Sequence, residues 1–89
     1  MLRMSRNDEA SRFEVRLIVK YAVVIEKGPT SYGATVPDLP GCVAVAETLE
    51  EVETLIREAI DFHIDGLRQD GLPVPPPTTI CEYVETQAA

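Results

Sequence analysis

The first half of the chain alternates apolar and polar residues in short runs, a pattern typical of β-strands. The longest run, residues 17–27, is rich in β-branched side chains and places every second residue on one apolar face. Residues 31–36 alternate again after the turn at Gly28 and Pro29, and residues 42–47 follow a second, proline-containing turn. We therefore predict three strands joined as an antiparallel meander.

The spacing of apolar residues becomes helical after Thr48. Thr48 and Glu51 fit the capping-box pattern, in which each side chain satisfies the other residue's free backbone amide. Gly71 and Pro73 mark the end, because glycine tolerates the left-handed conformation past a last turn and proline prevents continuation. These signals predict a helix over about residues 49–70. Its apolar stripe, spaced as in a helix lying on a sheet, contains Val52, Leu55, Ile56, Ala59, Ile60, His63 and Leu67.

The remaining segments complete the predicted domain. Residues 73–77 are mostly proline, which fixes φ and lacks an amide donor, so we expect an extended connector. Residues 80–85 alternate as a fourth strand that returns to the sheet or pairs with another chain. The expected fold is α+β with the order β-β-β-α-β, in which one long helix packs on one face of the sheet. Residues 1–16 are polar and predict a flexible N-terminal arm, which leaves residues 17–89 as the domain.

Size and charge restrict the partners that this domain can have. A chain of 89 residues supports one small core, so we expect a homo-oligomer, a dimer or a tetramer. Residues 1–20 carry five basic and three acidic residues, for a net charge of +2, whereas residues 21–89 carry three and twelve, for −9. An acidic body repels nucleic-acid phosphates, so direct nucleic-acid binding is not expected and a basic protein is the favoured partner. No apolar run suits a membrane span or a signal peptide, which predicts a cytoplasmic protein.

The residues that most often perform chemistry do not form a catalytic pattern. Cys42 and Cys81 fall in predicted strands and are expected to be reduced core residues. His63 lies within the apolar stripe of the helix, where a packed or interface histidine is favoured over a general base. One histidine without a Cys-x-x-Cys pair gives no zinc ligand set, and the carboxylates lack metal-site spacing. We therefore expect a binding protein without metal, cofactor or enzymatic activity.

Four segments carry a resemblance to a known family. They are YAVVIEK at residues 21–27, YGATVPDLPGC at 32–42, TLEE at 48–51 and IREAI at 56–60. The run PDLPGC followed by a T-x-x-E helix start is the most specific of these features. Over about residues 19–79 the chain resembles the HicB antitoxin family.

The resemblance implies a partial RNase H-like domain that binds a HicA-type toxin and blocks its active site. HicA toxins are small, basic proteins with a double-stranded-RNA-binding-like fold that cleave messenger RNA. Family members commonly add a C-terminal DNA-binding domain that represses their own operon. About ten residues follow the proline run here, so autorepression through such a domain is not expected. Two alternatives remain, a vestigial RNase H-like nucleic-acid enzyme and a DNA-binding autorepressor that acts through the basic arm.

Two surfaces are candidates for partner binding. The first is the turn and the adjoining sheet edge. The second is an acidic helix edge, together with Ile64, which we expect to project from the polar side of the helix. The candidate residues are Tyr32, Asp38, Leu39 and Cys42 on the first surface and Glu58, Asp61, Ile64 and Asp65 on the second.

Overall fold

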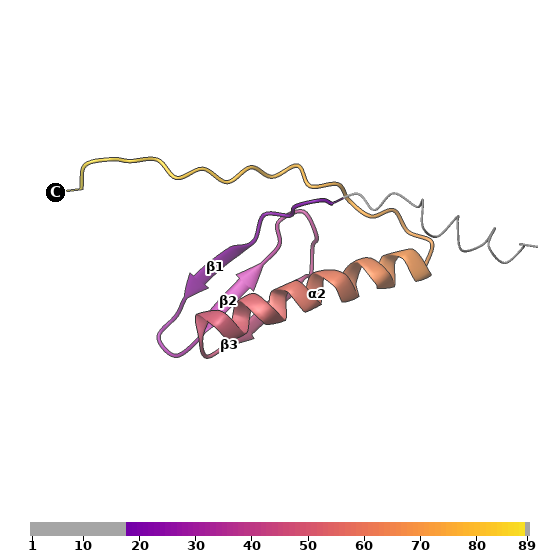
Figure 1. The fold of residues 1–89 in the computed structure, drawn as a ribbon, viewed down its shortest axis with the longest axis horizontal. Coiled ribbons are helices and arrows are strands. Elements are labelled where there is room, and N and C mark those ends of the chain that lie inside the picture. Colours follow the sequence, from indigo (N-terminus) through magenta and orange to yellow (C-terminus); the bar gives the residue numbers. More distant parts are fainter. Residues whose placement is uncertain (1–17, 89) are drawn as a thin grey trace, which may run out of the picture.

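A computed structural model describes residues 18–88 of the chain. It contains the strands β1 (Val24–Lys27), β2 (Tyr32–Thr35) and β3 (Val43–Ala46), followed by the helix α2 (Leu49–Gln69) (Figure 1). The strands form one antiparallel sheet in the order β1-β2-β3. The predicted α+β fold and its β-β-β-α order are confirmed. The predicted N-terminal arm lies outside the described residues.

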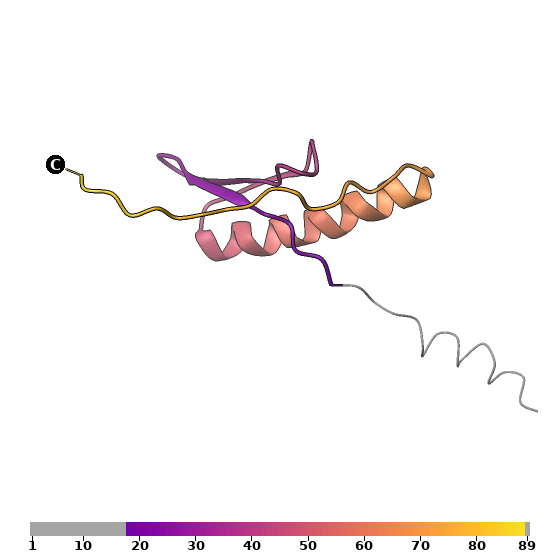
Figure 2. The same cartoon turned by 90° about the horizontal axis from the view of Figure 1, so that it is seen from above.

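The sheet and the helix form two layers, with α2 lying across one face of the sheet (Figure 2). Ile25, Ala34 and Ala44 are register partners in adjacent strands and form a row that packs toward the core. Because side chains alternate across a strand, Val24 and Val45 lie on the opposite face, where both are exposed. One face of the sheet is therefore covered by the helix, and the other remains open among the described residues.

The core is small and gathers where the β2–β3 turn meets the first half of the helix. Its fully buried large side chains are Leu39 of the turn and Val52 of α2. The turn is held by hydrogen bonds from the Leu39 amide to the Val36 carbonyl, 3.0 Å, and from the Cys42 amide to the Leu39 carbonyl, 3.0 Å. Its positive φ of 86° falls at Gly41, a conformation that glycine adopts without strain. The buried core residues are Ala34, Val36, Leu39, Cys42, Val52 and Ile56.

Both ends of the predicted helix are confirmed within one residue. The Glu51 amide donates to the Thr48 hydroxyl at 3.1 Å, and the Thr48 amide donates to Glu51 Oε1 at 3.2 Å, which completes the capping box. At the other end, Gly71 has a φ of 71° and the Leu72 amide donates to the Leu67 carbonyl at 2.9 Å. This geometry satisfies a carbonyl that the last turn would leave free.

The stripe of the helix that faces the core differs in part from the prediction. Val52 and Ile56 are buried as expected, but Leu55 is 42% exposed. Ile64 was predicted to project from the polar side, and this prediction is wrong, because Ile64 is half-buried and packs against the core. The inward line follows steps of four residues through Val52, Ile56, Ile60 and Ile64, which turns Leu55 toward its edge.

The strands predicted at both ends of the domain also differ. The first strand is shorter than residues 17–27, because its ladder with β2 stops where Val24 pairs with Thr35. The fourth strand, predicted over residues 80–85, is not formed: this segment is extended, exposed and unpaired with any described strand. As a result Cys81 is exposed rather than buried, whereas Cys42 is a core residue as expected.

Candidate functional site

The turn between β2 and β3 holds a distant part of the chain through Asp38. Its Oδ2 accepts hydrogen bonds from the backbone amides of Thr78, 3.0 Å, and Thr79, 2.9 Å. Its Oδ1 accepts hydrogen bonds from the hydroxyls of the same two threonines at 3.1 and 2.8 Å. We call these four hydrogen bonds the Asp38 clasp. Asp38 is thus engaged within the chain, although the sequence analysis placed it at a partner interface.

The proline-rich connector is fixed by a second contact close to the clasp. The Tyr21 hydroxyl donates to the Pro75 carbonyl at 2.5 Å. Tyr21 lies three residues before β1, and the connector runs from the end of α2 back along the β1 side of the sheet (Figure 1). Together, the Asp38 clasp and the Tyr21–Pro75 hydrogen bond fix the position at which the segment after Thr79 begins.

The clasp is expected to depend on pH. The hydrogen bond from the Thr79 amide is the main cause that lowers the pKa of Asp38, and desolvation opposes it only in part. A lowered pKa in the folded state means that the clasp is complete above the ordinary aspartate pKa of about 3.9 and is lost as the pH falls through the lower, folded value. In NMR titrations, the amide resonances of Thr78 and Thr79 should shift with a midpoint below that of an ordinary aspartate.

The variant Asp38→Asn should abolish this titration and speed hydrogen exchange at both threonine amides. Asp70→Asn is the matched control, since Asp70 is an exposed aspartate at the end of α2 that does not contact either threonine. Amide shifts and exchange rates in Asp38→Asn that match those of the unmodified chain would show that the clasp is absent in solution.

The other predicted residues of the turn and sheet edge belong mainly to the core. Leu39 is 0% exposed and Cys42 is 3% exposed, so both side chains belong to the core, and their partner-contact role stays a prediction. Burial also raises the pKa of the Cys42 thiol. Tyr32 is half-buried against the core, with the Lys27 Nζ 6.0 Å from the centre of its ring.

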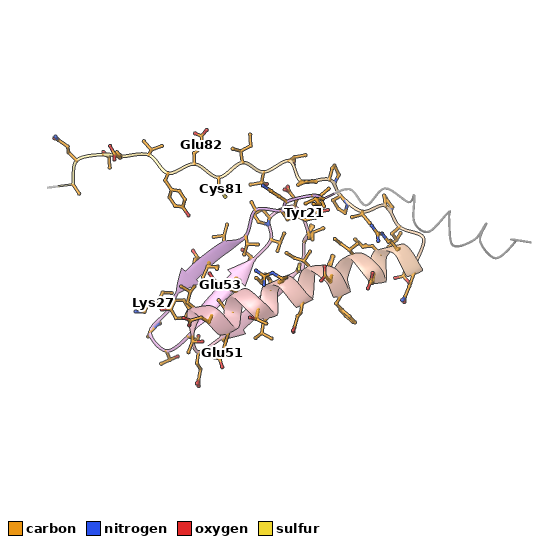
Figure 3. The ribbon with its side chains drawn as sticks, viewed as in Figure 1. Tyr21, Lys27, Glu51, Glu53, Cys81 and Glu82 are labelled. Atoms are coloured by element: carbon orange, nitrogen blue, oxygen red, sulfur yellow. The ribbon has the colours of Figure 1, made fainter. Side chains whose placement is uncertain are left out.

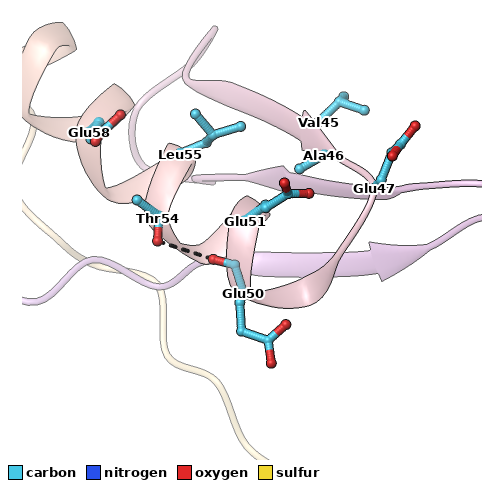
Figure 4. Close-up of a pocket in the computed structure, with 8 residues that line it drawn as sticks. All are labelled: Val45, Ala46, Glu47, Glu50, Glu51, Thr54, Leu55 and Glu58. Carbon is cyan, nitrogen blue, oxygen red and sulfur yellow. Dashed lines mark hydrogen bonds between the residues drawn. The ribbon is translucent and has the colours of Figure 1, made fainter.

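A groove lies between β3 and the first half of α2 (Figure 4). Its volume is about 610 Å³. Four of the eight residues that line it are glutamates and none is basic, while the side chains of Val45 and Leu55 add apolar surface. We call this feature the acidic groove. It is lined by Val45, Ala46, Glu47, Glu50, Glu51, Thr54, Leu55 and Glu58.

Local structure explains why glutamates gather here. Glu50 and Glu51 occupy the first turn of α2, where the helix dipole favours negative charge. Thr54 is neutral, and its hydroxyl donates back to the Glu50 carbonyl at 3.1 Å. Within residues 18–88 no group of three or more histidine, cysteine or acidic side chains could hold a metal ion. The groove is therefore a negatively charged concave surface that suits a positively charged protein segment.

The backbone beside the groove also favours protein binding. β3 is an edge strand, and in the described part of the chain only β2 pairs with it. The outer edge of such a strand presents free amide and carbonyl groups to which an extended segment can add. An incoming basic segment would thus meet both hydrogen-bonding groups and carboxylates.

The acidic helix edge continues this surface and includes an aromatic residue that the sequence analysis missed. Glu58, Asp61 and Asp65 are exposed as expected, but only Glu58 lines the groove. Phe62 is 82% exposed and follows Leu55 by two turns of the same helix face. Its position outside the apolar stripe was the available signal, since a large aromatic at a polar position often marks a contact surface.

The comparisons with known proteins place this chain in a family. Residues 21–88 match the model of the HicB-like antitoxin of bacterial toxin-antitoxin systems. An uncharacterized 14.9 kDa protein of Haemophilus phage HP1 is 39% identical over 64 residues, which are 72% of this chain and 48% of the phage protein. The chain thus spans about half the length of that relative.

Shorter relatives are also similar. A UPF0150 protein of Archaeoglobus fulgidus is 40% identical over 48 residues, 53% of this chain and 70% of that protein. A UPF0150 protein of Helicobacter pylori is 43% identical over 49 residues, 55% of this chain and 68% of that protein. No helix within residues 18–88 is both long and apolar enough to cross a membrane. The family model covers most of the chain, and the chain belongs to the HicB-like antitoxin family of bacterial toxin-antitoxin systems.

Proposed function

We propose that this protein is a cytoplasmic antitoxin that binds and neutralises a basic, messenger-RNA-cleaving toxin of the HicA type. Membership of the antitoxin family supports the role, and the acidic groove is the observation that supports a basic partner. In this proposal the protein acts by binding and not by catalysis. The toxin is inhibited because the complex covers the basic surface that it needs to hold RNA.

The groove supplies different kinds of contact for such a partner. Glu47, which directly follows β3, and Glu58 of α2 would face lysine or arginine side chains of the toxin. Leu55 in the groove and Phe62 beyond it would contribute apolar contacts, with Phe62 as the large aromatic anchor. Interfaces commonly combine a few apolar anchors with surrounding polar contacts, which agrees with this arrangement.

The experiment is a binding and cleavage assay with a HicA-type toxin, ideally one encoded beside this protein's gene. The chain should co-purify with the toxin and suppress its cleavage of messenger RNA in proportion to the amount added. The affinity should fall as salt is raised, because exposed charge pairs are screened. The proposal would be abandoned if an excess of folded chain neither bound the toxin nor reduced cleavage.

A further inference from the structure

The segment of residues 80–85 is extended and carries large apolar side chains without a partner. Ile80 is 81% exposed, Tyr83 is 101% exposed and Val84 is 79% exposed. The segment begins directly after the Asp38 clasp, so its start is fixed against the domain. Figure 3 shows Cys81 and Glu82 on this segment, which runs away from the sheet. An extended, alternating segment normally gains its stability from a neighbouring strand.

Two strand edges are open to such a segment among the described residues, and their charges differ. The edge of β3 borders the four glutamates of the acidic groove. The edge of β1 carries Lys27 beside Glu26 and follows Lys20, so its exposed charged groups are two bases and one acid. The segment itself carries Glu82 and Glu85. Charge complementarity therefore favours β1, because β3 would place acids against acids.

We propose that residues 80–85 of one molecule add as a strand to the β1 edge of a second molecule, and that the exchange is reciprocal. The same chain's segment passes its own β1 without forming a ladder (Figure 1). Pairing between two copies gives each exposed segment a partner and produces a closed, two-fold symmetric dimer. It also adds buried area to a domain in which six core residues are buried within residues 18–88.

The proposed dimer does not depend on the proposed toxin. The exchanged segment occupies β1, whereas the acidic groove borders β3 at the opposite edge of the sheet. The dimer therefore leaves the groove free, and a chain that fails to bind a toxin can still exchange its segment. Measurements on the purified chain alone are sufficient to test it.

The first test compares two proline variants by sedimentation equilibrium. Tyr83→Pro lies within the exchanged segment and removes an amide donor, so the dissociation constant of the dimer should rise by at least about tenfold. Gln87→Pro lies beyond the segment, in the same exposed tail, and should leave the constant unchanged. A monomeric unmodified chain, or a Tyr83→Pro dimer as stable as the original, would overturn the proposal.

The second test identifies the edge by disulfide formation, using the exposed Cys81 as the reporter. A cysteine is introduced in turn at each of the four β1 positions, and at Val45 of β3 as the control. A disulfide requires Cβ atoms about 3.5–4.5 Å apart, so only neighbouring positions react efficiently. At least one β1 variant should form a disulfide with Cys81 of the second molecule, and Val45→Cys should not.

Other products would each overturn the proposal. A disulfide within one chain would show that the segment pairs with its own β1. Efficient Cys81 to Cys81 cross-linking in the unmodified chain would show that two segments pair with each other. Preferential reaction at Val45→Cys, or no disulfide at any β1 position, would exclude the β1 edge.

Discussion

Replacing Leu39 by alanine should lower the free energy of unfolding by about 2–5 kcal/mol, the range measured for truncating a fully buried leucine. Leu39 is 0% exposed and lies in the turn between β2 and β3. It shares the core with Val52, the other large side chain that is fully buried. Small domains are stable by only about 5–15 kcal/mol, so the loss would be a large fraction of the total.

The measurement is urea unfolding followed by circular dichroism, with Leu72→Ala as the control. Leu72 is 52% exposed just after α2, and its truncation should change the stability by no more than about 0.5 kcal/mol. The sequence suggested Leu39 as a partner-contact residue, whereas the structure makes it a core residue. The two roles predict opposite effects of Leu39→Ala on stability. A Leu39→Ala variant that kept its stability but lost its partner would place Leu39 at the interface and contradict the structure.

Features fixed by nearby residues could be predicted from the sequence. The capping box needs only Thr48 and Glu51, three positions apart, and both of its hydrogen bonds are present. The glycine just after the end of α2 could also be predicted, because Gly71 adopts the positive φ that this position requires. The three strands were found for the same reason, since alternation within a few residues determines which face of a strand is apolar.

Features that depend on distant residues could not be predicted in this way. Asp38 is 40 positions from Thr78, and no local pattern indicates that its carboxylate binds two later amides. The turn around Asp38 carries much of the family resemblance, and its observed contacts are within the chain. Leu39 follows the same rule: it belongs to a polar, proline-rich turn by sequence, yet tertiary packing buries it.

The exposed residues of α2 illustrate a third limit. A helical wheel assigns a residue to a face of the helix only to within about one position. Leu55 was therefore placed in the apolar stripe but is largely exposed, whereas Ile64 was placed on the polar side but packs against the core. The acids were easier, because charged side chains remain exposed in almost any orientation of the helix. Phe62 was missed because acidic residues dominate the sequence pattern of the polar face, and the aromatic residue lies among them.

The two edges of the sheet differ in charge, and this difference connects the two proposals. β3 borders glutamates and suits a basic toxin, whereas the β1 edge, with Lys20, Glu26 and Lys27, is far less acidic and suits the acidic segment of a second copy. The β3 edge would also disfavour the acidic segment, because like charges placed together weaken a wrong complex. Under the two proposals, one small sheet would bind two different chains at separate edges.

Reversing the charge of Glu58 is expected to weaken toxin binding by at least about tenfold, because like charges across an interface are strongly unfavourable. Glu58 lines the acidic groove beside Leu55 and lies one turn before Phe62, so a lysine there would face the basic surface of the toxin. The variant is Glu58→Lys, and its affinity is measured by isothermal titration calorimetry at low and high salt. The loss should shrink at high salt, where the introduced repulsion is screened.

Glu53→Lys is the matched control, since it makes the same change in net charge on the same helix. Glu53 is exposed and is not one of the residues that line the groove. The affinity of the Glu53→Lys variant for the toxin should therefore stay within about threefold of that of the unmodified chain. The small remaining difference would come from the long-range effect of the changed charge. Both variants should unfold at the same urea concentration, because each replaces an exposed glutamate by an equally good helix former. Equal losses of affinity would indicate that net charge alone attracts the toxin, and an unchanged Glu58→Lys affinity would exclude the acidic groove as its binding site.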